Sequence, residues 1–155
     1  MSGVEISALI GVLLAAAGGT SAACVLYTIQ GYYKSAINRL LICLGACITI
    51  WSFGLAVQTA GASASIRFIG SRIAPVGYSM MFAFLLHYVL LLTRRHRLLQ
   101  KWWIYPLIYL PGLTSTFGLS ILPAILRTPD AMLQTSFGWV NTLSNGWVNF
   151  YYVYY

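Results

Sequence analysis

The chain has 155 residues, of which 59% are hydrophobic, 15% aromatic and only 7% charged. A soluble globular domain carries roughly 25% charged residues, so this composition excludes an ordinary soluble domain. The mean hydropathy of +0.78 agrees with that exclusion. Several uncharged apolar runs of about 20 residues are long enough to cross a hydrocarbon layer of roughly 30 Å as helices. We therefore predict an all-α, polytopic helical membrane protein in contact with the lipid bilayer.

The net charge of +7 does not indicate nucleic-acid binding. A nucleic-acid-binding protein gathers its basic residues on one solvated face, near aromatic side chains that stack on bases. Here the basic residues lie between apolar runs, which is typical of loops at the cytoplasmic surface of a membrane. We expect the basic residues to set the membrane topology, and we expect no nucleic-acid partner.

The first predicted span covers residues 6–29 and ends near Tyr32, Tyr33 and Lys34, which mark a membrane interface. Small residues recur in it at every fourth position, namely Gly11, Ala15, Gly19 and Ala23. A stripe of this kind lets a neighbouring helix approach closely in lipid. We predict that this stripe is a helix-packing face and that it could serve a homodimer.

The second and third predicted spans cover residues 40–60 and 73–93. Between them, the small polar residues of Gly61–Ser65 are typical of a connector, and Arg67 and Arg72 follow before the third span begins. Pro75 then falls in the first turn of the third span, where a missing N–H costs little.

The fourth predicted span covers residues 103–126 and contains Pro106, Pro111 and Pro123. Because proline removes a helical hydrogen bond, we expect this span to be kinked and locally unwound, with nearby hydroxyl groups binding the freed carbonyls. The following segment, to about residue 146, has no uninterrupted apolar stretch and is predicted to lie outside the bilayer. Residues 147–155 begin a fifth apolar element that is too short to cross. We interpret the chain as the front part of a longer protein.

The distribution of basic residues predicts that the N-terminus is outside the cell. With that orientation six basic residues are cytoplasmic and three are not; the six are Lys34, Arg39, Arg94, Arg95, Arg97 and Lys101. Cytoplasmic loops carry an excess of Lys and Arg, so this orientation satisfies the positive-inside rule.

The apolar runs contain no Asp, Glu, Lys or Arg, and His87 is their only ionisable candidate for function. On the predicted span His87 lies about 6 Å from the midpoint. It is either a neutral imidazole bonded to a neighbouring helix or a ligand-binding or proton-sensing group. Cys24, Cys43 and Cys47 have the pattern of buried apolar residues, and we expect no metal site. Nucleotide-binding loops and nucleophile motifs are absent, so we expect this segment to be non-catalytic and without a cofactor.

The stretch from Arg67 to Leu113 resembles the N-terminal seven-helix membrane region of bacterial sensor histidine kinases and of diguanylate cyclases of similar layout. The third span of that family carries a proline near its outer end and a Leu-His-aromatic segment near its inner end. This chain matches it with "RIAPVGYSMMFAFLLHYVLLLT", which contains Pro75 and Leu86-His87-Tyr88. The fourth span of the family opens with tryptophan and carries two prolines, as does "WWIYPLIYLPGL" here. A later extracytoplasmic Phe/Tyr-Gly-Trp element is matched by Phe137-Gly138-Trp139.

The resemblance implies a sensory input module in the bacterial inner membrane, with seven spans and a cytoplasmic output domain that this chain does not contain. It implies His87, Tyr88 and Trp139 as candidate contacts for a small ligand. Two other classes stay open. A small transporter or channel subunit would oligomerise through the small-residue face of the first span, and a structural membrane subunit would show neither transport nor a ligand response.

Overall fold

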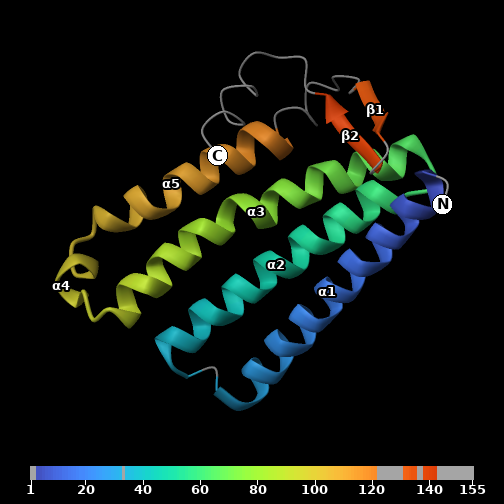
Figure 1. Cartoon of the computed structure of the whole chain (residues 1–155). Coiled ribbons are helices and arrows are strands. Elements are labelled where there is room, and N and C mark those ends of the chain that lie inside the picture. The colour runs from blue at the N-terminus through green and yellow to red at the C-terminus, as the bar shows by residue number, and fades with distance from the viewer. Residues whose placement is uncertain (1–2, 33, 122–130, 136–137, 143–155) are drawn as a thin grey trace.

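The computed structural model describes residues 3–32, 34–121, 131–135 and 138–142, as Figure 1 shows. Its helices are α1 (Gly3–Tyr32), α2 (Ala36–Ala60), α3 (Ala64–Leu92), the single turn α4 (His96–Leu99) and α5 (Ile104–Thr116). Helix α5 continues into a π-helical turn, η1 (Phe117–Ile121), and a hairpin follows, made of β1 (Ala131–Thr135) and β2 (Gly138–Thr142).

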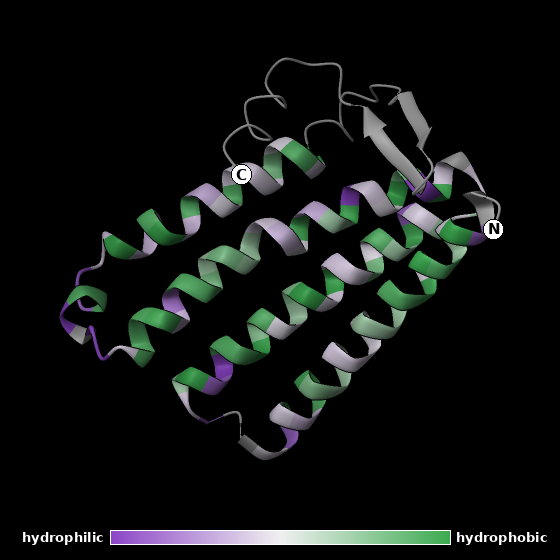
Figure 2. Cartoon of the chain, viewed as in Figure 1, coloured by the Kyte–Doolittle hydropathy of each residue, from purple (hydrophilic) through white to green (hydrophobic). Residues whose placement is uncertain are grey.

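Four helical segments are long and apolar enough to cross a membrane, namely α1, α2, α3 and the α5–η1 segment. Figure 2 shows the apolar colour along their lengths and hydrophilic colour mainly near their ends. The chain is therefore a helical multi-pass membrane protein by length and composition, as predicted. The predicted fifth span, residues 147–155, lies outside the described residues, as do residues 122–126 of the fourth.

Helix α3 begins nine residues before the predicted start of the third span. Ser63 caps it, because its hydroxyl oxygen accepts a hydrogen bond from the Ile66 amide at 3.3 Å. Arg67 Nε donates a hydrogen bond to the carbonyl oxygen of Gly61, the C-cap residue of α2, at 2.6 Å. The connector is thus only three residues long, and Arg67 and Arg72 lie on the helix. Pro75 is inside the helix rather than in its first turn.

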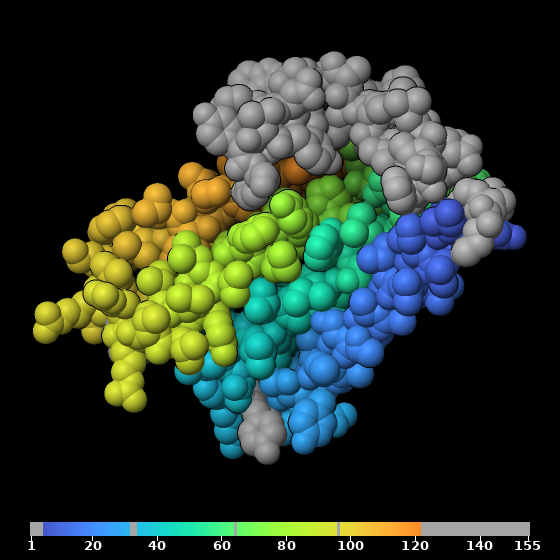
Figure 3. Space-filling view, in the orientation of Figure 1, coloured from blue at the N-terminus to red at the C-terminus, as the bar shows by residue number. Residues whose placement is uncertain are grey.

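The spans form a row in which α1, α2, α3 and α5 lie side by side in chain order (Figures 1 and 3). Each helix contacts mainly its neighbours in the sequence because short connections join antiparallel helices. The row is one helix thick, so many large apolar side chains are exposed and no large side chain in the described part is completely buried. In a bilayer these exposed apolar side chains contact lipid instead of water, which removes the hydrophobic cost of exposure.

Glycines on both helices allow α2 and α3 to pack closely. A Cβ added at Gly77 would collide with the carbonyl oxygen of Cys47 and lie 2.6 Å from the amide nitrogen of Trp51. Added at Gly54, it would lie 2.5 Å from the amide nitrogen of Ala74. Only glycine permits backbones to approach this closely, and lipid-embedded helices use such contacts to gain dispersion energy. This close contact between α2 and α3 was not predicted from the sequence.

The small-residue stripe of α1 is divided between two faces of the helix. Gly11 is buried against Ala60 of α2, and Gly18, which is not part of the stripe, lies against Phe53. In contrast, a Cβ added at Gly19 would meet no atom within 4 Å, and Ala23 is exposed. The α1 positions that lie against α2, Gly11 and Gly18, are seven residues apart, which is close to two helical turns. A repeat of four residues exceeds one turn of 3.6 residues at each step, so successive members of the stripe rotate around the helix and do not share one face. Pairing of the Gly19 side with a second copy stays a prediction.

The irregular turn of the fourth span begins six residues after Pro111. Pro106 falls in the first turn of α5, Pro111 lies inside it, and the π-helical turn begins at Phe117. Thr114 Oγ1 donates to the carbonyl oxygens of Leu110 and Pro111, both at 3.0 Å. The helix therefore changes from α to π geometry at Phe117, within the span that was predicted to be locally unwound. The Thr114 hydroxyl bonds to carbonyl oxygens of the preceding turn of α5.

The β1–β2 hairpin lies in the segment that was predicted to be outside the bilayer, and the sequence analysis did not predict strands there. Its antiparallel register pairs Gln134 with Trp139. Strand β2 contacts α1 and α2, and the hairpin lies at the end of the row that holds the start of α1 (Figure 1).

Candidate functional site

Arg72 is a buried cation inside a membrane-spanning helix, and the sequence analysis placed it in a loop. Its side chain is only 8% exposed. The guanidinium donates from Nη1 to the carbonyl oxygen of Leu119 in η1 at 3.2 Å and lies 4.6 Å from the ring centroid of Phe68. The Ser65–Leu92 segment is long and apolar enough to span a membrane, and Arg72 lies about 10 Å along the helix from the midpoint of that segment. The third span was predicted to begin at Ile73 and to contain no charged residue, whereas the candidate span in the structure begins earlier and includes Arg72.

Beside Arg72 is an open groove of about 600 Å³ between α3 and η1, bordered also by α2. Its walls are almost entirely apolar and consist of Ile50, Phe68, Ile69, Ile73, Val76 and Ile121. The two polar side chains in its lining are Arg72 and Ser120. Ser120 is 6% exposed, and its hydroxyl has no hydrogen-bond partner in the described part of the chain. An apolar groove with a few converging polar groups has the general character of a small-molecule site.

His87 lies near the other end of α3, in an aromatic cluster with α5. Its Nδ1 and the Tyr109 hydroxyl are 2.7 Å apart and share a hydrogen bond. The rings of Tyr105 and Tyr109 meet the imidazole edge to face, with centroids 5.6 Å and 5.9 Å away. Because α3 is longer than predicted, His87 lies about 13 Å along the helix from the midpoint of the Ser65–Leu92 segment. The hydrogen bond to a neighbouring helix, which was part of one of the two alternatives, is therefore present.

Of the three residues that were predicted to contact a ligand, His87 and Tyr88 are neighbours on α3, and Trp139 is not brought together with them. Tyr88 is half-buried on α3 beside His87. Trp139 belongs to β2, at the opposite end of the row, where the structure describes its backbone pairing. Arg72 is fifteen residues from His87, which is about 22 Å along a helix. The chain therefore offers two separate polar regions on α3, one at Arg72 and one at His87.

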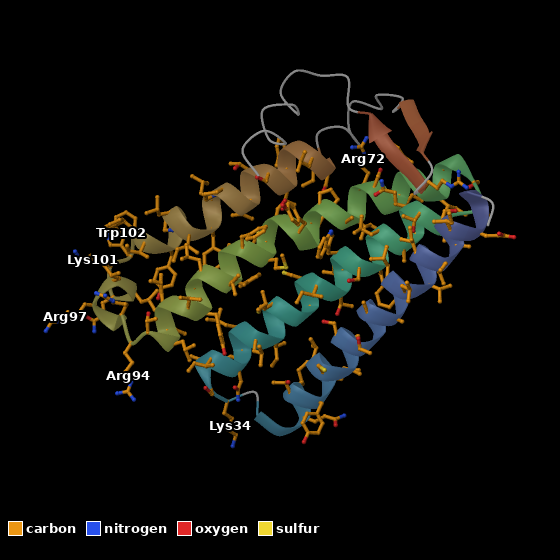
Figure 4. All side chains as sticks on the ribbon, in the orientation of Figure 1. Lys34, Arg72, Arg94, Arg97, Lys101 and Trp102 are labelled. Carbon is orange, nitrogen blue, oxygen red and sulfur yellow. The ribbon has the colours of Figure 1, made fainter. Side chains whose placement is uncertain are left out.

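The basic residues gather at one end of the row. Figure 4 shows Lys34, Arg94, Arg97 and Lys101 at the end that holds the α1–α2 and α3–α5 connections, and Arg72 toward the other end. Lys101 Nζ lies 5.9 Å from the ring centroid of Trp103. Tryptophan and lysine at a helix start are typical of the headgroup zone. This asymmetry in charge supplies a basis for a fixed orientation.

Within residues 3–32, 34–121 and the two strands, His, Cys, Asp and Glu form no group of three that could hold a metal. Cys24, Cys43 and Cys47 are free, and Cys24 is exposed where burial was expected. Neither observation adds a catalytic group to the two regions on α3.

We expect Tyr109→Phe to destabilise the protein by about 0.5–1.5 kcal/mol, the usual contribution of one hydrogen bond between membrane helices. The change keeps the ring against His87 and removes only the hydroxyl. SDS-induced unfolding of the purified chain in micelles measures the effect. Tyr105→Phe is the matched control, since its hydroxyl is not bonded to His87, and equal losses in both variants would contradict a specific His87–Tyr109 bond.

Comparison with family models, curated proteins and solved structures finds no match to this chain.

Proposed function

We propose that this chain is the N-terminal part of a sensory input module in the inner membrane of a bacterium, and that it relays a signal to a cytoplasmic output domain of a sensor kinase or diguanylate cyclase. The observation that carries the proposal is the pairing of α3 with the α5–η1 segment at two points. Arg72 bonds to Leu119 near one end of α3, and His87 bonds to Tyr109 near the other.

The two contacts provide a physical route for a signal. A ligand changes an equilibrium only when it binds one helix arrangement more strongly than another. A molecule in the groove would touch both α3 and η1 and would favour one arrangement of that pair. Between Tyr109 and Leu119 the fourth span contains Pro111 and the start of the π-helical turn, and such turns are frequent at functional sites. A shift of η1 would then alter the His87–Tyr109 contact near the α3–α5 connection.

The proposed orientation places the N-terminus and the hairpin outside the cell and the His87 end of α3 near the cytoplasm. The clustering of Lys34, Arg94, Arg97 and Lys101 at one end of the row supports it, because cytoplasmic connections are rich in basic residues. An odd number of spans in the parent protein would then deliver the output domain to the cytoplasm.

The full-length gene product tests the proposal when its output is measured in nanodiscs as autophosphorylation or cyclic-dinucleotide synthesis. We expect Tyr109→Phe to change the basal output about fivefold, since a difference of about 1 kcal/mol changes an equilibrium by that factor. Tyr105→Phe should leave the output near the wild-type level because it removes no bond between α3 and α5.

Two results would contradict this function. One is a reading frame that continues into no kinase or cyclase domain, and the other is identical output from wild type and Tyr109→Phe. Solute flux through liposomes that contain the chain would instead favour the transporter or channel alternative. Some support for that alternative comes from buried hydroxyls on α3 and the fourth span that lack partners in the described residues, at Ser79, Thr116 and Ser120.

A further inference from the structure

We propose that the groove between α3 and η1 binds a long-chain fatty acid, with its carboxylate at Arg72 and Ser120 and its hydrocarbon chain along the isoleucine-rich wall. This inference deepens the proposed function and rests on it only in treating the bound acid as the signal. Binding itself is a property of the chain that can be measured without any output domain.

The head of the ligand is identified by the two polar groups of the groove. Arg72 presents a planar guanidinium, whose geometry matches a carboxylate, and its contacts with Leu119 and Phe68 hold it at the groove wall. Ser120 adds a hydroxyl that is buried and has no partner in the described residues. A carboxylate accepts hydrogen bonds from both groups, and a charge-assisted bond is strong where water is excluded.

The tail of the ligand is identified by the walls. Ile69 is 53% exposed, Ile73 40% and Ile121 45%, so the groove is open at the surface of the helices, and we expect an apolar chain to enter it from the bilayer. Ile73 and Val76 extend the apolar wall from Arg72 toward the middle of the span. The volume of about 600 Å³ is within the ~300–1,000 Å³ typical of small-molecule sites. It suits one hydrocarbon chain better than a whole two-chain phospholipid.

The depth of Arg72 in the bilayer favours a fatty acid over other anions as the ligand. With α3 centred in a hydrocarbon layer of roughly 30 Å, Arg72 lies about 10 Å from the middle of the bilayer, below the headgroup layer. The phosphate of a bilayer phospholipid lies at the surface and would have to sink to reach it. A free inorganic anion would gain no binding energy from the apolar walls of the groove. A fatty acid is small enough at its head to reach this depth and apolar enough elsewhere to stay there.

The test uses the purified 155-residue chain in phosphatidylcholine nanodiscs and a photoreactive palmitate as the probe. Competition with unlabelled palmitate gives the affinity, and peptide mapping gives the labelled residues. We expect labelling near residues 69–76 and 119–121. Arg72→Gln should weaken binding at least about tenfold, the loss typical of a hydrogen bond to a charged group, and Ser120→Ala about threefold.

Two controls separate specific binding from charge attraction and misfolding. Arg67→Gln removes a cation from the same end of α3 but outside the groove lining, and it should change affinity less than about twofold, because a distant charge contributes little. Ile73→Trp keeps Arg72 but fills the groove at an exposed position, so it should block labelling while the chain stays folded. The hexadecanol analogue of the probe should bind weakly and equally to wild type and Arg72→Gln.

Unchanged palmitate affinity in Arg72→Gln would overturn the proposal, and so would displacement of the probe by phosphatidylglycerol but not by palmitate. The second result would assign the groove to a bilayer lipid. If palmitate binds the groove but leaves the output of the full-length gene product unchanged, the ligand assignment stands and its role as the signal fails. If Tyr109→Phe alters output but palmitate does not bind, the sensory function stands and the ligand assignment fails.

Discussion

Replacing Gly77 with leucine is expected to prevent the close packing of α2 and α3. A Cβ at this position would collide with the carbonyl oxygen of Cys47, and its next neighbour is the amide nitrogen of Trp51 at 2.6 Å. Both obstacles are backbone atoms, which cannot rotate away as a side chain can. Overpacking usually costs about 1–3 kcal/mol, and we expect a cost at or above the upper end because a whole leucine must fit.

Gly19→Leu is the matched control for Gly77→Leu. It adds the same side chain to a membrane helix, but a Cβ at Gly19 meets no atom within 4 Å. Since leucine favours the helix over glycine, this variant should be as stable as wild type or gain up to about 1 kcal/mol. SDS unfolding and the yield of monodisperse protein measure both variants. Equal destabilisation would show that α2 and α3 do not meet at Gly77, whereas dimer loss in Gly19→Leu alone would support a second copy on that side of α1.

Neutralising the basic connection between α3 and α5 is expected to abolish the fixed orientation of the chain. With Arg94, Arg95, Arg97 and Lys101 all changed to glutamine, the proposed cytoplasmic side keeps only Lys34 and Arg39. The other side keeps Arg67, Arg72 and Arg127, so the excess that orients the wild-type chain is gone. We expect a mixture of the two orientations where the wild type has one.

Labelling of intact cells with a membrane-impermeant maleimide measures this effect in a chain without its native cysteines. In the wild-type background Ala62→Cys, in the α2–α3 connector, should be labelled, and Ser35→Cys, in the α1–α2 connector, should be protected. Both positions are exposed, so burial does not confuse the comparison. In the quadruple variant the two labels should become roughly equal. Labelling of Ser35→Cys but not Ala62→Cys in the wild-type background would reverse the proposed orientation.

The ends of the spans were harder to predict than their existence, and Arg72 shows why. An apolar run was taken to stop at a charged residue, which moved the start of the third span from Ala64 to Ile73. In the structure Ser63 caps the helix and Arg67 binds the end of α2, so both polar residues belong to the helical hairpin. A sequence signal for the longer helix existed, because Phe68 and Arg72 are four residues apart and suit contact on one helix face.

The candidate site could be predicted only in part. His87 was identified from the sequence because it is the lone ionisable group of its run, and its bond to a neighbouring helix was one of two stated alternatives. Tyr109, its partner, carries no comparable signal among eleven tyrosines. The groove could not be predicted at all, since Arg72 and Ser120 are separated by most of two helices and meet only when α3 packs on η1.

The sequence by itself determined that this is a multi-pass membrane protein, because the length and hydropathy of a spanning helix are properties of a continuous run of residues. It also determined the uneven distribution of basic residues between the two ends of the spans. Only the tertiary structure decided which glycines touch a neighbour, which residues line the groove, and that Arg72 is buried. Those features depend on the rotation and depth at which one helix meets the next, and contacts between distant residues fix both.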